Sequence, residues 1–167
     1  MSSGLLAPAR KRGSALLYIG SPTPRNAATH VINAPGRYRS GLIALSLDGS
    51  GAMGLLGPQE ILARPVSASL VVMNGCHSAQ GDPLPSTGLM GLTRAWIGAG
   101  AKAVMATGWD IPDGAAQSLM ADFYRALRSS PERSAAFALR DAQLKAIQRS
   151  DGRATEWAAY SLLSRLQ

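Results

Sequence analysis

An alternation of short apolar runs with longer segments of helical periodicity constrains the fold of this chain more than any other sequence feature. The run Ser69–Met73 is continuously apolar and rich in β-branched residues, as is typical of a strand covered on both faces. A helix is expected to begin with Thr87 as its N-cap, and the next strand is expected at Ala103–Thr107. This alternation predicts an α/β fold in which right-handed crossovers build a mostly parallel sheet between helical layers.

The other expected elements follow from breakers and apolar spacing. The expected strands are Ser14–Gly20, Ala27–Asn33 and Leu42–Leu47, and the expected helices are Pro58–Ala63, one that Asp113 caps, and Glu132–Gln148. The run Trp157–Leu163 fits either a last strand or a short helix. Residues 1–13 are expected to form a basic tail, so that residues 14–167 make up a single domain.

Composition narrows the classes of function. The formal charge of +7 keeps nucleic-acid binding open as a minor hypothesis, but the arginines are scattered and no aromatic residues interleave with them, which argues against it. No apolar run approaches the length of about 20 residues that a membrane span needs, so no membrane contact is expected. The single cysteine excludes an internal disulfide, in agreement with a cytoplasmic protein.

Cofactor and metal motifs are missing from the sequence. One cysteine and two histidines without CxxC or HxxxH spacing make a poor set of metal ligands. No glycine-rich phosphate motif follows a strand. We therefore expect neither a metal nor a cofactor.

A cysteine–histidine pair is the candidate catalytic group. Cys76 follows Met73 by three residues, at the carboxyl end of an expected strand, where reacting groups gather in parallel sheets. His30 lies 46 residues upstream near another strand end, whereas His77 adjoins Cys76 and is expected to point elsewhere. A nearby imidazole raises the thiolate fraction of a cysteine and can protonate a leaving amine. Such a cysteine is more often a small buried hydrophobe, but the polar turn Asn74–Gly81 would leave the thiol exposed.

An ordered series of motifs carries a family resemblance. The motifs are Ala28-Thr29-His30, Arg39–Leu42, Leu70–Cys76, Leu89–Ala101, Thr107–Asp113, Ala138–Gln143 and Trp157–Tyr160. Along most of residues 27–163 the sequence resembles the CHAT family, bacterial relatives of caspases and separase. The resemblance implies a three-layer αβα caspase-like fold and a Cys-His dyad, Cys76 and His30, that cleaves peptide bonds. It also implies an oxyanion hole formed by the backbone N–H groups of Val31 and Cys76.

The segment Trp109–Asp113 resembles a separase motif in which an acidic residue meets the arginine before the cut. Asp113 matches that position, Asp110 is the second choice, and Trp109 would line the same cleft. A carboxylate there could bind a guanidinium through two parallel hydrogen bonds, which lysine cannot reproduce. Asp113 also precedes an expected helix and would serve equally well as its N-cap.

The chain departs from the family pattern in ways that divide the functional hypotheses. Val31 stands where the family usually has glycine, and Gly75 stands where alanine is usual. His30 follows Ser14–Gly20 almost at once, where several tens of residues are expected, so the sheet would be incomplete and expose an apolar edge or face. The main hypothesis is an arginine-directed cysteine endopeptidase acting on a protein or peptide. The alternative is an inactive CHAT remnant that acts as a scaffold. Apart from the substrate, the expected binding partner of the chain is a regulatory protein or a second copy of the chain.

Overall fold

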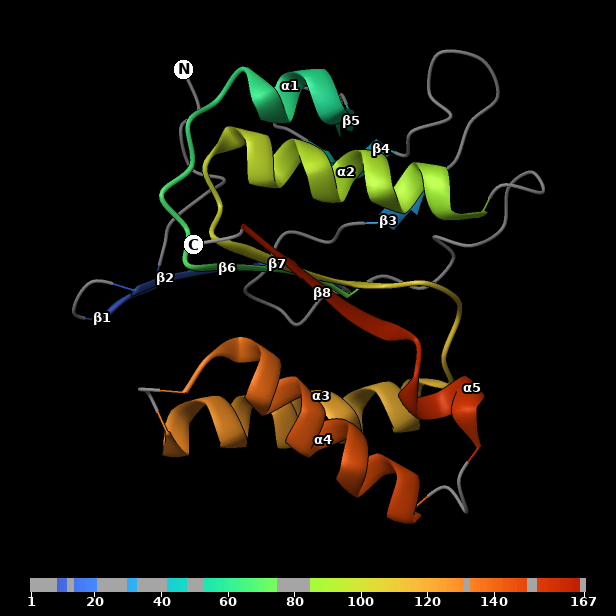
Figure 1. Cartoon of the computed structure of the whole chain (residues 1–167). Coiled ribbons are helices and arrows are strands. Elements are labelled where there is room, and N and C mark those ends of the chain that lie inside the picture. The colour runs from blue at the N-terminus through green and yellow to red at the C-terminus, as the bar shows by residue number, and fades with distance from the viewer. Residues whose placement is uncertain are drawn as a thin grey trace.

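The computed structural model gives the arrangement of the helices and strands and of part of the connecting chain (Figure 1). The residues that it describes are 9–11, 14–20, 30–32, 42–47, 53–74, 85–130, 133–149 and 153–165. These residues form two sheets and five helices, so the chain mixes helices and strands as the sequence predicts.

The larger sheet has five strands in the order β1-β2-β6-β7-β8. Their bounds are β1 Ala9–Lys11, β2 Ser14–Gly20, β6 Leu70–Asn74, β7 Ala103–Thr107 and β8 Tyr160–Ser164. The three central strands run parallel, whereas β1 and β8 pair antiparallel at the two edges. The expected mostly parallel sheet is therefore a mixed sheet. The two edge strands run opposite to their neighbours. Neither β1 nor β8 is joined to the strand it pairs with by the crossover connection that places two neighbouring strands parallel.

Helices cover both faces of this sheet (Figure 1). Helix α1, Pro58–Leu62, and helix α2, Pro85–Ala99, lie on one face, and helix α3, Asp113–Ser129, and helix α4, Ala135–Arg149, lie on the other. Helix α2 begins two residues before Thr87, which is therefore inside the helix and not its N-cap.

The alternation of side chains along β6 divides the core into two halves. Val71 and Met73 pack with the side chains of α2, whereas Leu70 and Val72 pack with those of α3 and α4. All four residues are buried, which explains why the strand is apolar without alternation. Burying one such side chain fully contributes roughly 1.5–3 kcal/mol, so these strands are strongly fixed between the helices.

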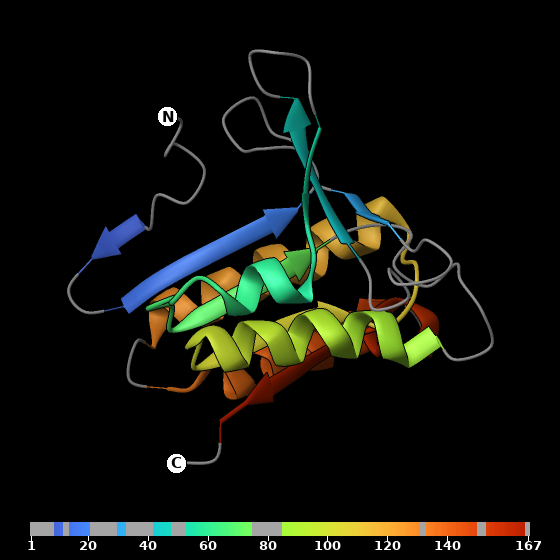
Figure 2. The same ribbon diagram turned by 90° about the horizontal axis from the view of Figure 1, so that it is seen from above.

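The smaller sheet was not expected as a separate unit. It has the order β3-β4-β5, with β3 His30–Ile32, β4 Leu42–Leu47 and β5 Met53–Leu56, and both of its pairings are antiparallel. Both views place β3 at the end of the molecule toward which β2 and β6 point (Figure 2). Ile43 of β4 is fully buried in the same core half as α2. The residues 21–29 lie outside the described residues, so the shortened segment before His30 stays a prediction.

The turn after α2 requires a glycine. Gly100 has a φ of 122°, a backbone conformation that residues other than glycine rarely adopt. A Cβ at this position would also lie 2.5 Å from the carbonyl oxygen of Val66. The backbone N–H of Val66 donates to the carbonyl of Ala99 at 2.8 Å, which holds the segment before β6 against the end of α2. This contact helps to fix where β6 enters the sheet.

The end of the chain contains both alternatives left open by the sequence. Helix α5, Ala154–Trp157, is followed after a short turn by strand β8. The preceding helix α4 begins at Ala135, three residues later than expected, and ends at Arg149. Within the described residues no helix is both long and apolar enough to cross a membrane.

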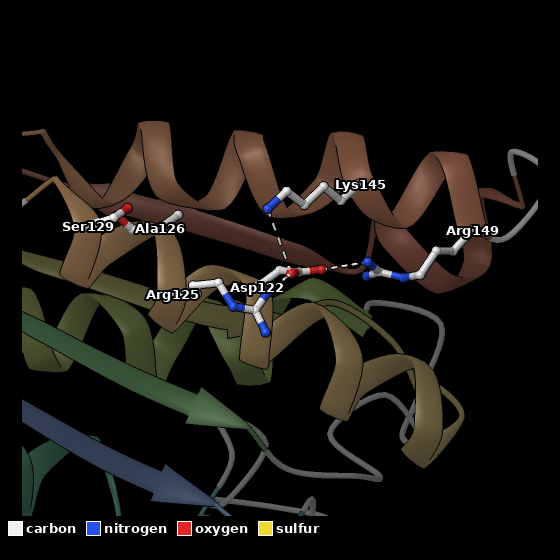
Figure 3. Close-up of polar contacts among 6 residues, drawn as sticks. All are labelled: Asp122, Arg125, Ala126, Ser129, Lys145 and Arg149. Carbon is white, nitrogen blue, oxygen red and sulfur yellow. Dashed lines mark hydrogen bonds and ion pairs between the residues drawn. The ribbon is translucent and has the colours of Figure 1, made fainter.

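A buried carboxylate joins α3 to α4 (Figure 3). Arg149 of α4 donates to Asp122 of α3 at 2.6 Å, Arg125 forms a second hydrogen bond and ion pair with it, and the Nζ of Lys145 lies 3.9 Å away. Burial alone would raise the pKa of Asp122. The hydrogen bond and charge of Arg149, the charge of Lys145 and the hydrogen bond from Arg125 outweigh burial, so the pKa lies below its ordinary value.

Candidate active site

The candidate site lies where β6 and β7 end. The two strands are parallel neighbours with Met73 opposite Ala106, so the segments that follow them emerge at one edge of the sheet. Asn74 is the last residue of β6 and Thr107 is the last residue of β7. The carboxyl edge of parallel strands is where α/β proteins place reacting groups, in agreement with the sequence interpretation.

The two proposed dyad residues differ in what the structure says of them. Cys76 lies among residues 75–84, outside the described residues. His30 is the first residue of β3, opposite Ala44, and Val31 follows it opposite Ile43. His30 was expected near a strand end in the same parallel sheet as the cysteine strand; it begins a strand of the smaller antiparallel sheet instead, because β3 pairs with β4. The distance from its imidazole to the Cys76 sulfur stays a prediction.

The segment after β7 exposes polar groups on an anchored backbone. The N–H of Gly108 donates to the carbonyl of Ala159 at 2.8 Å, and the indole N–H of Trp109 donates to the carbonyl of Thr155 at 3.0 Å. The Trp109 side chain is still 39% exposed. Ile111 is buried against the α3 side of the core, whereas Asp110 and Asp113 are exposed. The segment therefore presents one aromatic ring and two carboxylates at the end of β7.

Asp113 does not cap α3. The N-cap position belongs to Pro112, no side-chain cap hydrogen bond forms there, and Asp113 is the first residue of the helix itself. A residue with helical backbone angles is past the point from which a side chain caps the next turn. Its negative charge in the first turn still interacts favourably with the positive end of the helix dipole.

A polar connection at the same edge was missed from the sequence. The hydroxyl of Tyr160, at the start of β8, donates to Oδ1 of Asn74 at 2.6 Å. Gln143 of α4 donates from Nε2 to the carbonyls of Trp157 and Tyr160 at 3.2 and 3.1 Å. Asn74 could be noticed in the sequence only as the polar residue that follows the apolar residues of β6. Nothing in the sequence indicated that Tyr160 would be its hydrogen-bond partner.

Comparisons with known proteins agree with these motifs. The family model of the CHAT domain matches residues 27–165, and the chain therefore belongs to the CHAT domain family. A Mus musculus protein, Tetratricopeptide repeat protein 28, is 30% identical to it over 111 residues, which cover 65% of this chain and 4% of the mouse protein. The chain thus spans only a small part of the length of that relative.

Proposed function

We propose that this chain is a caspase-like cysteine endopeptidase in which Cys76 attacks the scissile carbonyl and His30 acts as its base. Membership of the CHAT family carries this proposal. The imidazole would take the thiol proton and later deliver a proton to the leaving amine. The backbone N–H groups of Val31 and Cys76 would stabilise the oxyanion.

The geometry around β6 supports the proposal. Cys76 follows the last residue of β6 by two positions, at the carboxyl edge of the parallel strands. Strand β3, which begins with His30, lies at the end of the molecule toward which β2 and β6 point (Figures 1 and 2). A histidine and a cysteine from two different sheets can meet at such an end, and the three-layer caspase-like arrangement belongs to the same proposal.

The substrate residue before the cut is proposed to be arginine. Asp113 is exposed in the segment that leaves the strand next to β6, with Asp110 as the second candidate in the same segment. Asp113 is the first residue of α3 and Pro112 holds the N-cap position, so the proposed arginine-binding role does not compete with a role as N-cap. The half-exposed ring of Trp109, held by Thr155, would form one wall beside the arginine side chain.

A non-catalytic binding module is the second candidate. The observation that favours it is the mouse relative, in which a region like this chain makes up a small part of a protein named for its tetratricopeptide repeats. In that case the same surface would contact a protein partner, a regulatory protein or a second copy, without cleaving it.

The chemistry of the single cysteine separates the two candidates. Because the chain has one cysteine, the rate of alkylation reports on Cys76 alone. If the dyad forms, alkylation should stay fast well below the ordinary thiol pKa of about 8.5, and reporter peptides should be cleaved after arginine. Both properties should disappear in His30→Ala, and cleavage should disappear in Cys76→Ala. An ordinary thiol titration without cleavage of peptides ending in arginine, lysine or leucine would favour the binding module.

A further inference from the structure

We propose that Tyr160 is a positioning residue for the nucleophile, acting through Asn74. This inference rests on the proposed function, since it assigns a role at the same site. The Tyr160 hydroxyl donates to Asn74 Oδ1 at 2.6 Å. Asn74 precedes Cys76 by two residues, so their Cα atoms lie at most about 7.2 Å apart.

The hydrogen bond spans a strand. Tyr160 stands opposite Thr107 on β7, and β7 lies between β8 and β6 in the sheet. A tyrosine at this position therefore reaches across its neighbour to the next strand, roughly 9–10 Å away by ordinary strand spacing. Phenylalanine would fill the same space without the donor.

The tyrosine is itself firmly held. Only 3% of its surface is exposed, and it packs with the core residues on the α3 and α4 side. Gln143 of α4 binds its backbone carbonyl and that of Trp157, which fixes the start of β8. A buried hydroxyl that loses its acceptor is costly, so the Tyr160–Asn74 contact is energetically enforced.

This anchor matters because Gly75 is the one residue between Asn74 and Cys76. Glycine can adopt more backbone conformations than any other residue, so a constraint on Asn74 matters more before a glycine than before a residue with a Cβ. Holding the Asn74 side chain as well as its backbone narrows the directions in which the chain can leave the strand. Small displacements of a nucleophile lower catalysis strongly, so an anchor at this point acts on kcat.

The corner between α5 and β8 (Thr155–Tyr160) also holds the proposed specificity segment. The carbonyl of Ala159 accepts from Gly108, and that of Thr155 accepts from the Trp109 indole. The nucleophile strand and the arginine-binding segment are thus tied to one short stretch of chain. Removing the Tyr160 hydroxyl should break the contact with Asn74 and leave the hydrogen bonds from Gly108 and Trp109 intact.

The test compares Tyr160→Phe with Tyr124→Phe in the full chain. Tyr124 is a matched control because its hydroxyl is also buried, on α3, where its ring packs against Phe123. We expect Tyr160→Phe to lower kcat on an arginine reporter peptide roughly 3- to 10-fold, as loss of one hydrogen bond implies, and to change KM less than about twofold. Alkylation by iodoacetamide should slow by a similar factor at pH 6 and be unchanged at pH 9. Tyr124→Phe should change none of these values.

A double variant tests whether the effect passes through Asn74. Asn74→Ala and Tyr160→Phe should together lower kcat no further than the more damaging single substitution. Additive losses would overturn the inference. So would a kcat for Tyr160→Phe equal to that of the parent protein, or a loss that Tyr124→Phe reproduces.

Hydrogen exchange separates failure of this inference from failure of the proposed function. If the parent protein cleaves no peptide and its thiol titrates ordinarily, the peptidase proposal falls. The anchoring role then still predicts faster amide exchange in the peptide that contains Asn74 for Tyr160→Phe than for Tyr124→Phe. Equal exchange in the two variants would overturn the anchoring role whatever the activity of the protein.

Discussion

Replacing Asp122 by alanine removes the carboxylate that joins α3 to α4. Its side chain is 7% exposed and contacts Arg125, Lys145 and Arg149, two of them through hydrogen bonds. The cations come from both helices, so the carboxylate is shared across the helix–helix contact (Figure 3). Losing it leaves Arg125, Lys145 and Arg149 without the carboxylate that pairs with each of them.

The size of the effect follows from the exposure of the partners. A hydrogen bond to a charged group contributes about 1.5–3 kcal/mol, and breaking a fully buried ion pair costs about 3–5 kcal/mol. The three cations are about half exposed, so water replaces much of what they lose. We therefore expect Asp122→Ala to lower the free energy of unfolding by about 2–3 kcal/mol, within the first range and no higher than the lower limit of the second. At about 2–4 °C per kcal/mol for a chain of this size, the melting temperature should fall by roughly 4–12 °C.

Urea unfolding followed by circular dichroism measures this loss, and Asp141→Ala is the matched control. Asp141 lies on α4, pairs with Arg133 at 3.1 Å, and its side chain is 31% exposed. An ion pair of that exposure contributes no more than about 1 kcal/mol. If Asp122→Ala cost no more than Asp141→Ala, the carboxylate would be no more than a surface charge and the reasoning from burial would be refuted.

Two further predictions concern pH and substrate choice. Because folding holds the pKa of Asp122 below its ordinary value of 3.8, its contribution to stability is present above that pH and is lost as the pH falls through the folded-state pKa. Between pH 5 and pH 3 the urea midpoint should thus fall more for the parent protein than for Asp122→Asn, and parallel curves would contradict this. For substrate choice, Asp113→Ala should lower kcat/KM on an arginine peptide at least about 10-fold more than on a neutral one. Equal losses of kcat/KM on both peptides, with a lower melting temperature, would show that Asp113 only stabilises the start of α3 through its charge and does not bind arginine.

Strands bounded by breakers and filled by apolar residues could be predicted to the residue. This holds for Ser14–Gly20, Leu42–Leu47 and Ala103–Thr107, because burial dominates their energy and glycine, proline or aspartate marks their ends. Strand β5, Met53–Leu56, was missed because it is short and shows no alternation of apolar and polar residues. Its existence depends on pairing with β4, which is a property of the tertiary structure.

The partner of a strand was harder to predict than the strand itself. The sequence indicated that His30 lies in an extended segment, but the segment pairs with β4 in a second sheet and does not join the strand of the cysteine. Likewise, Asp113 was expected as an N-cap from residue type alone, whereas the helix includes it and leaves Pro112 at the cap. In both cases the residue type allowed two environments, and packing chose between them.

The polar contacts at the site show why a motif can be recognised in the sequence while the contacts of its side chains cannot be predicted. The sequence contained Trp157–Tyr160 as a motif of the last strand, and it contained Asn74 and Trp109 within two others. Their connection requires β8 to run antiparallel beside β7, so that Tyr160 reaches over β7 to Asn74 while Thr155 and Ala159 hold the segment after β7. A tyrosine in a last strand is otherwise only a large side chain for the core. Its hydroxyl gives the motif a second use, because the same corner that completes the sheet can also set the direction in which the chain leaves β6 toward Cys76.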